Sequence, residues 1–130
     1  MQSRFFIQLR NYATGSYKKT TGIVGIPVHL NARPELISLY QRINHNIQRI
    51  PATSAYRKGT EALVKERLDI VEKTESIEEI EQKIGLGQIE ELLLAAEDEI
   101  KLIDVIAADE SWKPLEETPI PGQWEYFNQK

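Results

Sequence analysis

The stretch YKKTTGIVGIPV, residues 17–28, groups two lysines, two threonines and two glycines, which are residue types that could hold a phosphate group. A Walker A loop requires Gly-x-x-x-x-Gly-Lys-Ser/Thr between a strand and a helix. Here the lysines precede the glycines, and Pro27 follows where a helix should start. GIVG is also too short for the dinucleotide fingerprint, and no βαβ pattern surrounds it. The stretch is therefore not predicted to bind a nucleotide.

The same stretch has a second feature, which is a run of apolar residues: Ile23, Val24, Ile26 and Val28. Gly22 and Gly25 would let such residues lie flat on a surface. An exposed apolar strip usually marks an interface, so we expect this segment to contact another protein.

No other group of residues predicts catalysis or metal binding. The chain has no cysteine, and its histidines, His29 and His45, have no partner at metal-ligand spacing. Carboxylates are frequent, but a general acid or base needs a tuned pKa in a dry cleft. The acids of the last helix, among them Glu90, Glu91, Glu97 and Glu99, are expected on faces that water solvates. We expect no bound cofactor, no metal and no enzymatic activity of the chain's own.

The elements that carry these residues have helical periodicity. Asn31 is a plausible N-cap for a first helix that Pro51 stops, and Thr53 or Ser54 can cap a second. Ser76 and Glu79 form a capping box for a short helix that Gly85 ends. The longest helix starts near Gln88. The predicted fold is all-α, an antiparallel three-helix bundle with an additional short helix.

The apolar positions at steps of three and four give the expected core. They are Leu36, Leu39, Tyr40, Ile43, Ile47, Ile50, Tyr56, Leu63, Val64, Leu68, Val71, Ile77, Ile80, Ile84, Ile89, Leu92, Leu93, Ala96, Ile100, Ile103 and Ala107.

Length and charge limit the function classes. The 130 residues suit one domain, and 41% apolar with 28% charged residues is typical of a globular chain. No run reaches the roughly 18–20 apolar residues of a transmembrane helix. Residues 1–34 contain no acid, whereas residues 75–110 carry a net charge of −10. An acidic surface excludes nucleic acid as a partner. It is either a solvated face or a docking face for a basic protein.

The two ends differ from the body. MQSRFFIQLRNYATGS is basic, acid-free and amphipathic as a helix, like a mitochondrial transit peptide. RNYA resembles a matrix processing site that would leave Ala13 as the N-terminus; the other interpretation is a short basic tail. The opposite end carries three prolines and both tryptophans and cannot be one helix. We expect Trp112 to point inward and Trp124 outward. The predicted divisions are a presequence (1–12), an extended docking segment (13–30), a helical bundle (31–110) and an extended, irregular C-terminal arm (111–130).

Five stretches in this order resemble one known family. They are KKTTGIVG (18–25), IPATSAYRKGTE (50–61), GQIEELLLAAEDE (87–99), WKPLEE (112–117) and PGQW (121–124). Together they resemble the alpha-subcomplex subunit 5 family of mitochondrial NADH:ubiquinone oxidoreductase, respiratory complex I. The likeness covers about Lys18 to Trp124; the N-terminal extension departs from members whose similarity begins close to their start.

The resemblance implies a non-catalytic accessory subunit, with no flavin, iron–sulfur cluster or quinone site of its own. It implies a helical bundle on the matrix-facing peripheral arm, peripheral to the mitochondrial inner membrane. There it would pack beside the core iron–sulfur protein 3 subunit and support assembly or stability of the arm. The alternative function is a free helical adaptor that binds a basic partner through its acidic face.

Twelve positions match the family's pattern and are our candidate partner-docking residues. They are Lys18, Lys19, Thr20, Thr21, Gly22, Gly25, Tyr56, Arg57, Lys58, Trp112, Pro114 and Trp124. Arg57 and Lys58 stand near a predicted helix N-terminus, where cations oppose the macrodipole. A compensating carboxylate is expected, either on a partner or within the chain at Glu61 or the last helix.

Overall fold

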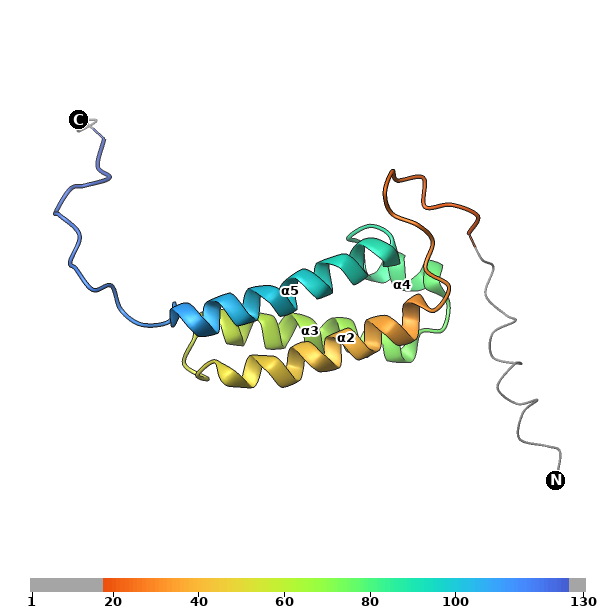
Figure 1. Cartoon of the computed structure of the whole chain (residues 1–130), viewed down its shortest axis with the longest axis horizontal. Coiled ribbons are helices and arrows are strands. Elements are labelled where there is room, and N and C mark those ends of the chain that lie inside the picture. Colours follow the sequence, from red (N-terminus) through yellow and green to blue (C-terminus); the bar gives the residue numbers. More distant parts are fainter. Residues whose placement is uncertain (1–17, 127–130) are drawn as a thin grey trace, which may run out of the picture.

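A computed structural model describes residues 18–126 of the chain. Over this range the chain forms four α-helices and one short 3₁₀ helix, without a strand (Figure 1). The elements are α2 (Ala32–Asn46), η1 (Ile47–Arg49), α3 (Ala55–Lys73), α4 (Ile77–Ile84) and α5 (Ile89–Asp109). The all-α prediction is confirmed for these residues. The predicted presequence, 1–12, lies outside them.

Helix α2 packs against both α3 and α5, and the short α4 contacts the same two helices. α3 runs back along α2, and after α4 the chain turns again so that α5 follows the direction of α2 (Figure 1). Residues 18–31, the N-terminal loop, lie beside α4 and the start of α5. Residues 111–126, the C-terminal segment, leave the opposite end of the molecule (Figure 1).

Local signals that the sequence predicted set the ends of α4 and the start of α5. The predicted N-caps of α2 and α3, Asn31 and Ser54, form no side-chain capping hydrogen bond, and α2 ends at Asn46, where η1 follows ahead of Pro51. The Ser76 hydroxyl accepts a hydrogen bond from the Glu79 N–H at 3.5 Å, at the start of α4. Gly85 ends α4 with φ of +68°, a left-handed conformation that favours glycine. Gln88 precedes α5 as its N-cap, and the Glu91 carboxylate accepts the Gln88 N–H at 2.8 Å. The N–H of the N-cap residue is thereby satisfied.

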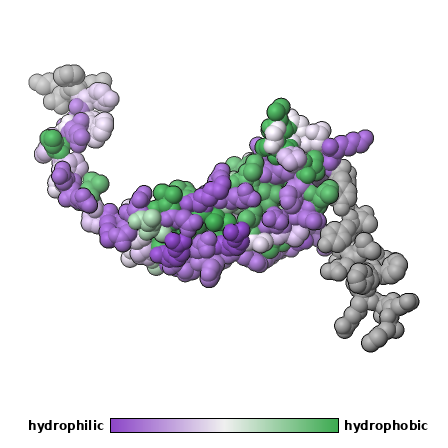
Figure 2. Space-filling view, viewed as in Figure 1, coloured by the Kyte–Doolittle hydropathy of each residue, from purple (hydrophilic) through white to green (hydrophobic). Residues whose placement is uncertain are grey.

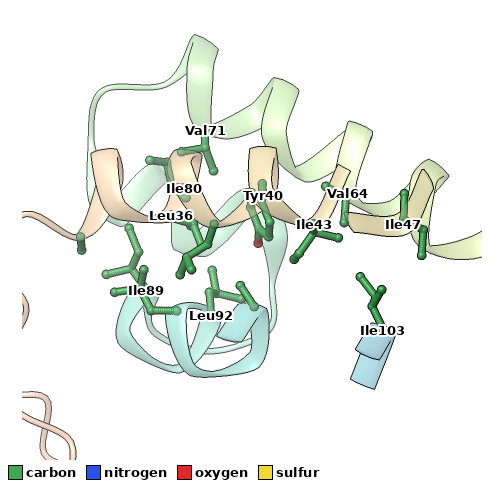
Figure 3. Packing of buried hydrophobic residues seen from close by; sticks show 14 of the residues in the cluster. Leu36, Tyr40, Ile43, Ile47, Val64, Val71, Ile80, Ile89, Leu92 and Ile103 are labelled. Atoms are coloured by element: carbon green, nitrogen blue, oxygen red, sulfur yellow. The ribbon is translucent and has the colours of Figure 1, made fainter. Parts of the chain in front are cut away.

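The core contains side chains from all the helices and from η1 (Figure 3). Its buried members are Ala32, Leu36, Leu39, Tyr40, Ile43, Ile47, Ile50, Val64, Val71, Ile80, Ile89, Leu92, Leu93, Ala96 and Ile103. The remaining predicted positions pack half-buried against this cluster, with one exception. Leu63 is 44% exposed, so its assignment to the core is wrong. The inner face of α3 follows Thr60, Val64 and Val71, and Leu63 lies about 100° round the helix from Val64.

Candidate functional site

The N-terminal loop is attached to the helices by a group of polar side chains that we call the Lys18 cluster: Lys18, Glu81, Gln88 and Glu90. The Lys18 ammonium lies 2.7 Å from Glu81 Oε1, 2.7 Å from Glu90 Oε2 and 3.1 Å from Gln88 Oε1. Gln88 also donates through Nε2 to the Thr21 carbonyl at 2.6 Å. The cluster therefore joins the loop to α4 and to the first turn of α5.

Glu90 is the most buried charged group of the cluster, with only 3% of its side chain exposed. Its second oxygen accepts the His29 N–H at 3.3 Å. Glu81 Oε1 accepts the Ile89 N–H at 2.8 Å, which is one of the free donors at the start of α5. A buried carboxylate is costly unless it is paired and hydrogen-bonded, and the helix N-terminus adds a favourable field. Glu90 has its ion pair with Lys18 and its hydrogen bond from His29 only while the loop is in place.

The pKa values follow from the same contacts. Burial alone would raise the pKa of Glu90, but hydrogen bonds from Lys18, its own backbone and His29, together with the Lys18 charge, hold the pKa below its usual range. Partial burial alone would lower the pKa of Lys18, but its hydrogen bonds and charge attraction to Glu81 and Glu90 raise the pKa overall. Both groups are therefore ionised near neutral pH and stabilise each other.

The expectation that the acids of the last helix are solvated is wrong for Glu90. Its cation partner stands 72 residues earlier in the chain, so no local pattern connects the two. Glu91 is half-buried and caps its own helix, Glu99 is half-buried beside Tyr56, and Glu97 is exposed as expected. Sequence reasoning also missed Glu81 and Gln88 as partners of the loop. The one signal in the sequence that could have indicated these partners is the absence of acids from residues 1–34, because the cations of that segment can pair only with carboxylates from later in the chain or from another protein.

The tip of the loop, residues 23–26, is a tight turn. The Ile26 N–H donates to the Ile23 carbonyl at 3.3 Å, and Gly25 has φ of +83° at the third position, where a type II turn favours glycine. The Thr21 hydroxyl donates to the Ile26 carbonyl at 2.5 Å and accepts the Ile23 N–H at 3.2 Å. Thr21 is buried and fixes the turn from inside. Val24, at the outermost position, is fully exposed.

The remaining predicted residues of this segment are arranged around the tip. Thr20 accepts the Gly22 N–H through its hydroxyl at 3.1 Å, and Gly22 has φ of +72°. Lys19 and Gly22 are exposed. The hydroxyls of Thr20 and Thr21 and the Lys18 ammonium are thus bound within the chain. These groups build a loop that holds an apolar turn in solvent (Figure 2, upper right).

The second predicted group, Tyr56, Arg57 and Lys58, begins α3. The Tyr56 hydroxyl donates to Glu99, and burial together with this carboxylate raises the pKa of Tyr56 to about 12. Arg57 donates to Glu61 at 2.8 Å, to the Ile50 carbonyl at 2.7 Å and to Gln48. The carboxylate expected beside Arg57 is therefore within its own chain. Lys58 is exposed.

The C-terminal segment has one inward and one outward tryptophan, in the orientations that the sequence predicted. Trp112 is half-buried against the core, and with Tyr56 and Ile106 it lines a hollow of about 330 Å³. Pro114 is exposed, and Trp124 is 83% exposed. Leu115, Ile120 and Tyr126 are also exposed along this segment. The twelve candidate residues thus form two groups at opposite ends of the helices (Figure 1).

Residues 18–126 contain neither a metal-binding cluster nor a membrane-spanning helix. No cluster of three or more His, Cys, Asp or Glu side chains in this range is arranged to hold a metal ion. None of the helices within it is long and apolar enough to cross a membrane.

Comparison with known proteins gives one consistent result. A family model described as "ETC complex I subunit conserved region" matches residues 25–91, about half of the chain. NADH dehydrogenase (ubiquinone) 1 alpha subcomplex subunit MCI4 of Candida albicans is 44% identical over 85% of this chain and 80% of its own length. The corresponding subunit 5 of Bos taurus is 38% identical over 86% of this chain and 97% of its own length. An Arabidopsis thaliana relative whose name ends in "mitochondrial" is 42% identical over 73% of this chain and 56% of its own length.

These matches extend well beyond the loop, since they cover the helical body and most of the described residues. They confirm the resemblance that the five sequence stretches indicated. The chain belongs to the complex I alpha subcomplex subunit 5 family.

Proposed function

We propose that this chain is a non-catalytic accessory subunit of mitochondrial respiratory complex I. It supplies binding surface on the matrix-facing peripheral arm and supports assembly or stability of that arm during electron transfer from NADH to ubiquinone. In this proposal it binds no cofactor of its own, and it attaches to the inner membrane peripherally, through other subunits. Its relatives are named as subunits of the same enzyme.

The observation that carries the proposal is the distribution of exposed apolar side chains. The core of the helical body is closed, because most of its large apolar residues are buried or half-buried. Yet Val24 at one end, and Leu115, Ile120 and Trp124 at the other, are exposed by more than two thirds. Such side chains are typical of protein interfaces, where aromatic anchors carry much of the binding energy. A free adaptor that binds through acidic helices would not need them.

The first neighbour to test is the core iron–sulfur protein 3 subunit, which the family resemblance suggests. A photo-reactive amino acid would be placed at position 24 or 124 of the chain in intact mitochondria. Cross-linked products would then be identified by mass spectrometry. We expect a cross-link to the iron–sulfur protein 3 subunit from at least one position. Cross-links only to proteins outside complex I would reject the proposal.

The assembly role needs a separate experiment. Removal of the chain should reduce the amount of assembled peripheral arm in native gels, and re-expression should restore it. Peptides from the mature chain should begin at Ala13 if the predicted presequence is cleaved, and the protein should be protected from protease until the inner membrane is opened. Normal arm assembly without the chain would contradict the assembly role.

A further inference from the structure

We propose that the tip of the N-terminal loop is a preorganised plug for an apolar socket, rimmed by carboxylates, on a neighbouring complex I subunit. This inference rests on the proposed function and specifies the chemistry of one of its contacts.

The plug is apolar at its outermost point. Val24 is fully exposed and Ile23 is 37% exposed, and the two residues are adjacent at the turn. The turn projects from the helical body (Figure 2). A branched aliphatic side chain at the summit of a tight turn fits a small concave apolar pocket, which would remove it from water on all sides.

The contacts that hold the plug in shape include a buried charge, which costs free energy. In the isolated chain the exposed Val24 side chain gains no burial in return. Four hydrogen bonds or ion pairs fix both sides of the turn: two from the Lys18 ammonium and one each from the Thr21 hydroxyl and the Gln88 amide. To form them, the chain desolvates the carboxylate of Glu90. What this arrangement presents to solvent is a rigid apolar turn. Rigidity before binding reduces the conformational entropy lost on association, which is an advantage for a docking element.

The charge around the plug indicates the rim of the socket. Residues 18–34 contain no acid, and Lys19 is exposed next to the loop's anchor. Among residues 18–126, no carboxylate forms an ion pair with Lys19, whereas Glu81 and Glu90 are both paired to Lys18. Lys18 is thus neutralised within the chain, and Lys19 is left as the exposed cation beside the turn. Charge complementarity therefore calls for a carboxylate on the partner next to Lys19.

The apolar part is tested by substitution of Val24 in the full chain, expressed in mitochondria that lack the wild-type protein. Val24→Asp should reduce the fraction of the chain that comigrates with complex I by about tenfold or more, while Val24→Leu should retain it. Leu63→Asp, at an exposed leucine on α3, is the matched control and should assemble normally. Because Val24 is fully exposed, the urea midpoint of purified Val24→Asp chain should equal that of the wild type.

The results separate the two proposals. If the wild-type chain is absent from complex I, the proposed function fails. If the wild-type chain is present and Val24→Asp assembles equally well, only the plug is overturned.

The charged rim is tested by zero-length carbodiimide cross-linking of the assembled complex, which joins a lysine to a carboxylate in contact with it. We expect Lys19 to be joined to an aspartate or glutamate of another subunit, and Lys19→Glu to weaken incorporation. Cross-links from Lys19 only to this chain's own carboxylates, together with normal incorporation of Lys19→Glu, would overturn the rim.

Discussion

Substitution of Lys18 by methionine tests the attachment of the N-terminal loop most sharply. Methionine keeps an unbranched side chain of similar length but removes the charge that pairs with Glu81 and Glu90 at 2.7 Å. Glu90, with 3% of its side chain exposed, would then lack its cation. We expect the variant to be less stable and its loop to detach.

The expected loss in the free energy of unfolding of Lys18→Met lies between two limits. Removal of one partner from a fully buried ion pair costs about 3–5 kcal/mol, whereas exposed pairs contribute about 0.2–1 kcal/mol. The Lys18 side chain is 27% exposed and that of Glu81 is 22% exposed, so solvent screens part of the attraction. Detachment of the loop would also let water reach Glu90, which limits the penalty. We therefore expect the free energy of unfolding to fall by about 1–3 kcal/mol.

The loss should depend on pH in a defined direction. In the wild type the pKa of Glu90 is lowered, so its contribution to stability is present above the unfolded value and lost as pH falls through the lower folded value. The pKa of Lys18 is raised, so its contribution is present below its unfolded value and lost only at strongly alkaline pH. The difference between wild type and Lys18→Met should be largest near pH 7 and shrink as pH falls through the lowered pKa of Glu90, below which the carboxyl group is protonated in both.

The assay is urea unfolding followed by circular dichroism, at pH 7 and at acid pH, with Lys101→Met as the control. Lys101 pairs with Asp98 on the exposed side of α5, and its loss should leave the midpoint unchanged. Glu90→Gln should lower the midpoint of the wild type but raise that of Lys18→Met, because it removes the uncompensated charge. Equal effects of Glu90→Gln in both backgrounds would refute the coupling.

Three other predictions concern the helical body and use the same unfolding measurement. Tyr56→Phe removes the hydroxyl that donates to a carboxylate of α5, so it should cost about 1 kcal/mol at pH 7; an unchanged midpoint would mean that water replaces the bond without loss. Gly59→Ala should stabilise α3 by about 0.5–1 kcal/mol because an added Cβ meets open space, whereas Gly85→Ala should destabilise the chain by about 1 kcal/mol because φ is +68° there. A change of the same sign in both variants would contradict the helical conformation at Gly59 or the left-handed conformation at Gly85. Leu36→Ala should lower the free energy of unfolding by about 2–5 kcal/mol because this side chain is fully buried, and Leu63→Ala should lower it by less than about 1 kcal/mol. Similar losses in the two variants would show that Leu63 is a core residue after all.

Much of the helical body could be predicted from the sequence because its signals are local. Capping at Ser76, the glycine at position 85 and the apolar steps of three and four act within one or two turns of a helix. A helix begins and ends where such neighbours satisfy its free backbone groups. The error at Leu63 has a local origin as well, since a leucine next to Val64 fits the apolar stripe equally well on paper. Which of the two faces inward depends on where α2 lies against α3.

The attachment of the loop could not be predicted because it depends on contacts across the chain. Lys18 meets Glu81 and Glu90, 63 and 72 residues away. Before the fold is known, Glu90 is one of twelve acids between residues 75 and 110, with nothing in its neighbours to distinguish it. The order of lysines, threonines and glycines in residues 17–28 differs from that of a phosphate-binding loop, and this can be seen in the sequence itself. The role of this stretch in building a turn depends on the hydrogen bond of the Thr21 hydroxyl and on the positive φ of Gly25, which are properties of the folded chain.

Native gel electrophoresis of detergent-solubilised mitochondria, followed by mass spectrometry for this chain, tests the central claim most directly. We expect the chain to migrate with the band that carries NADH dehydrogenase activity and to be absent from low-mass fractions. Migration of the full amount as a small species, separate from that activity, would contradict membership of the assembled enzyme.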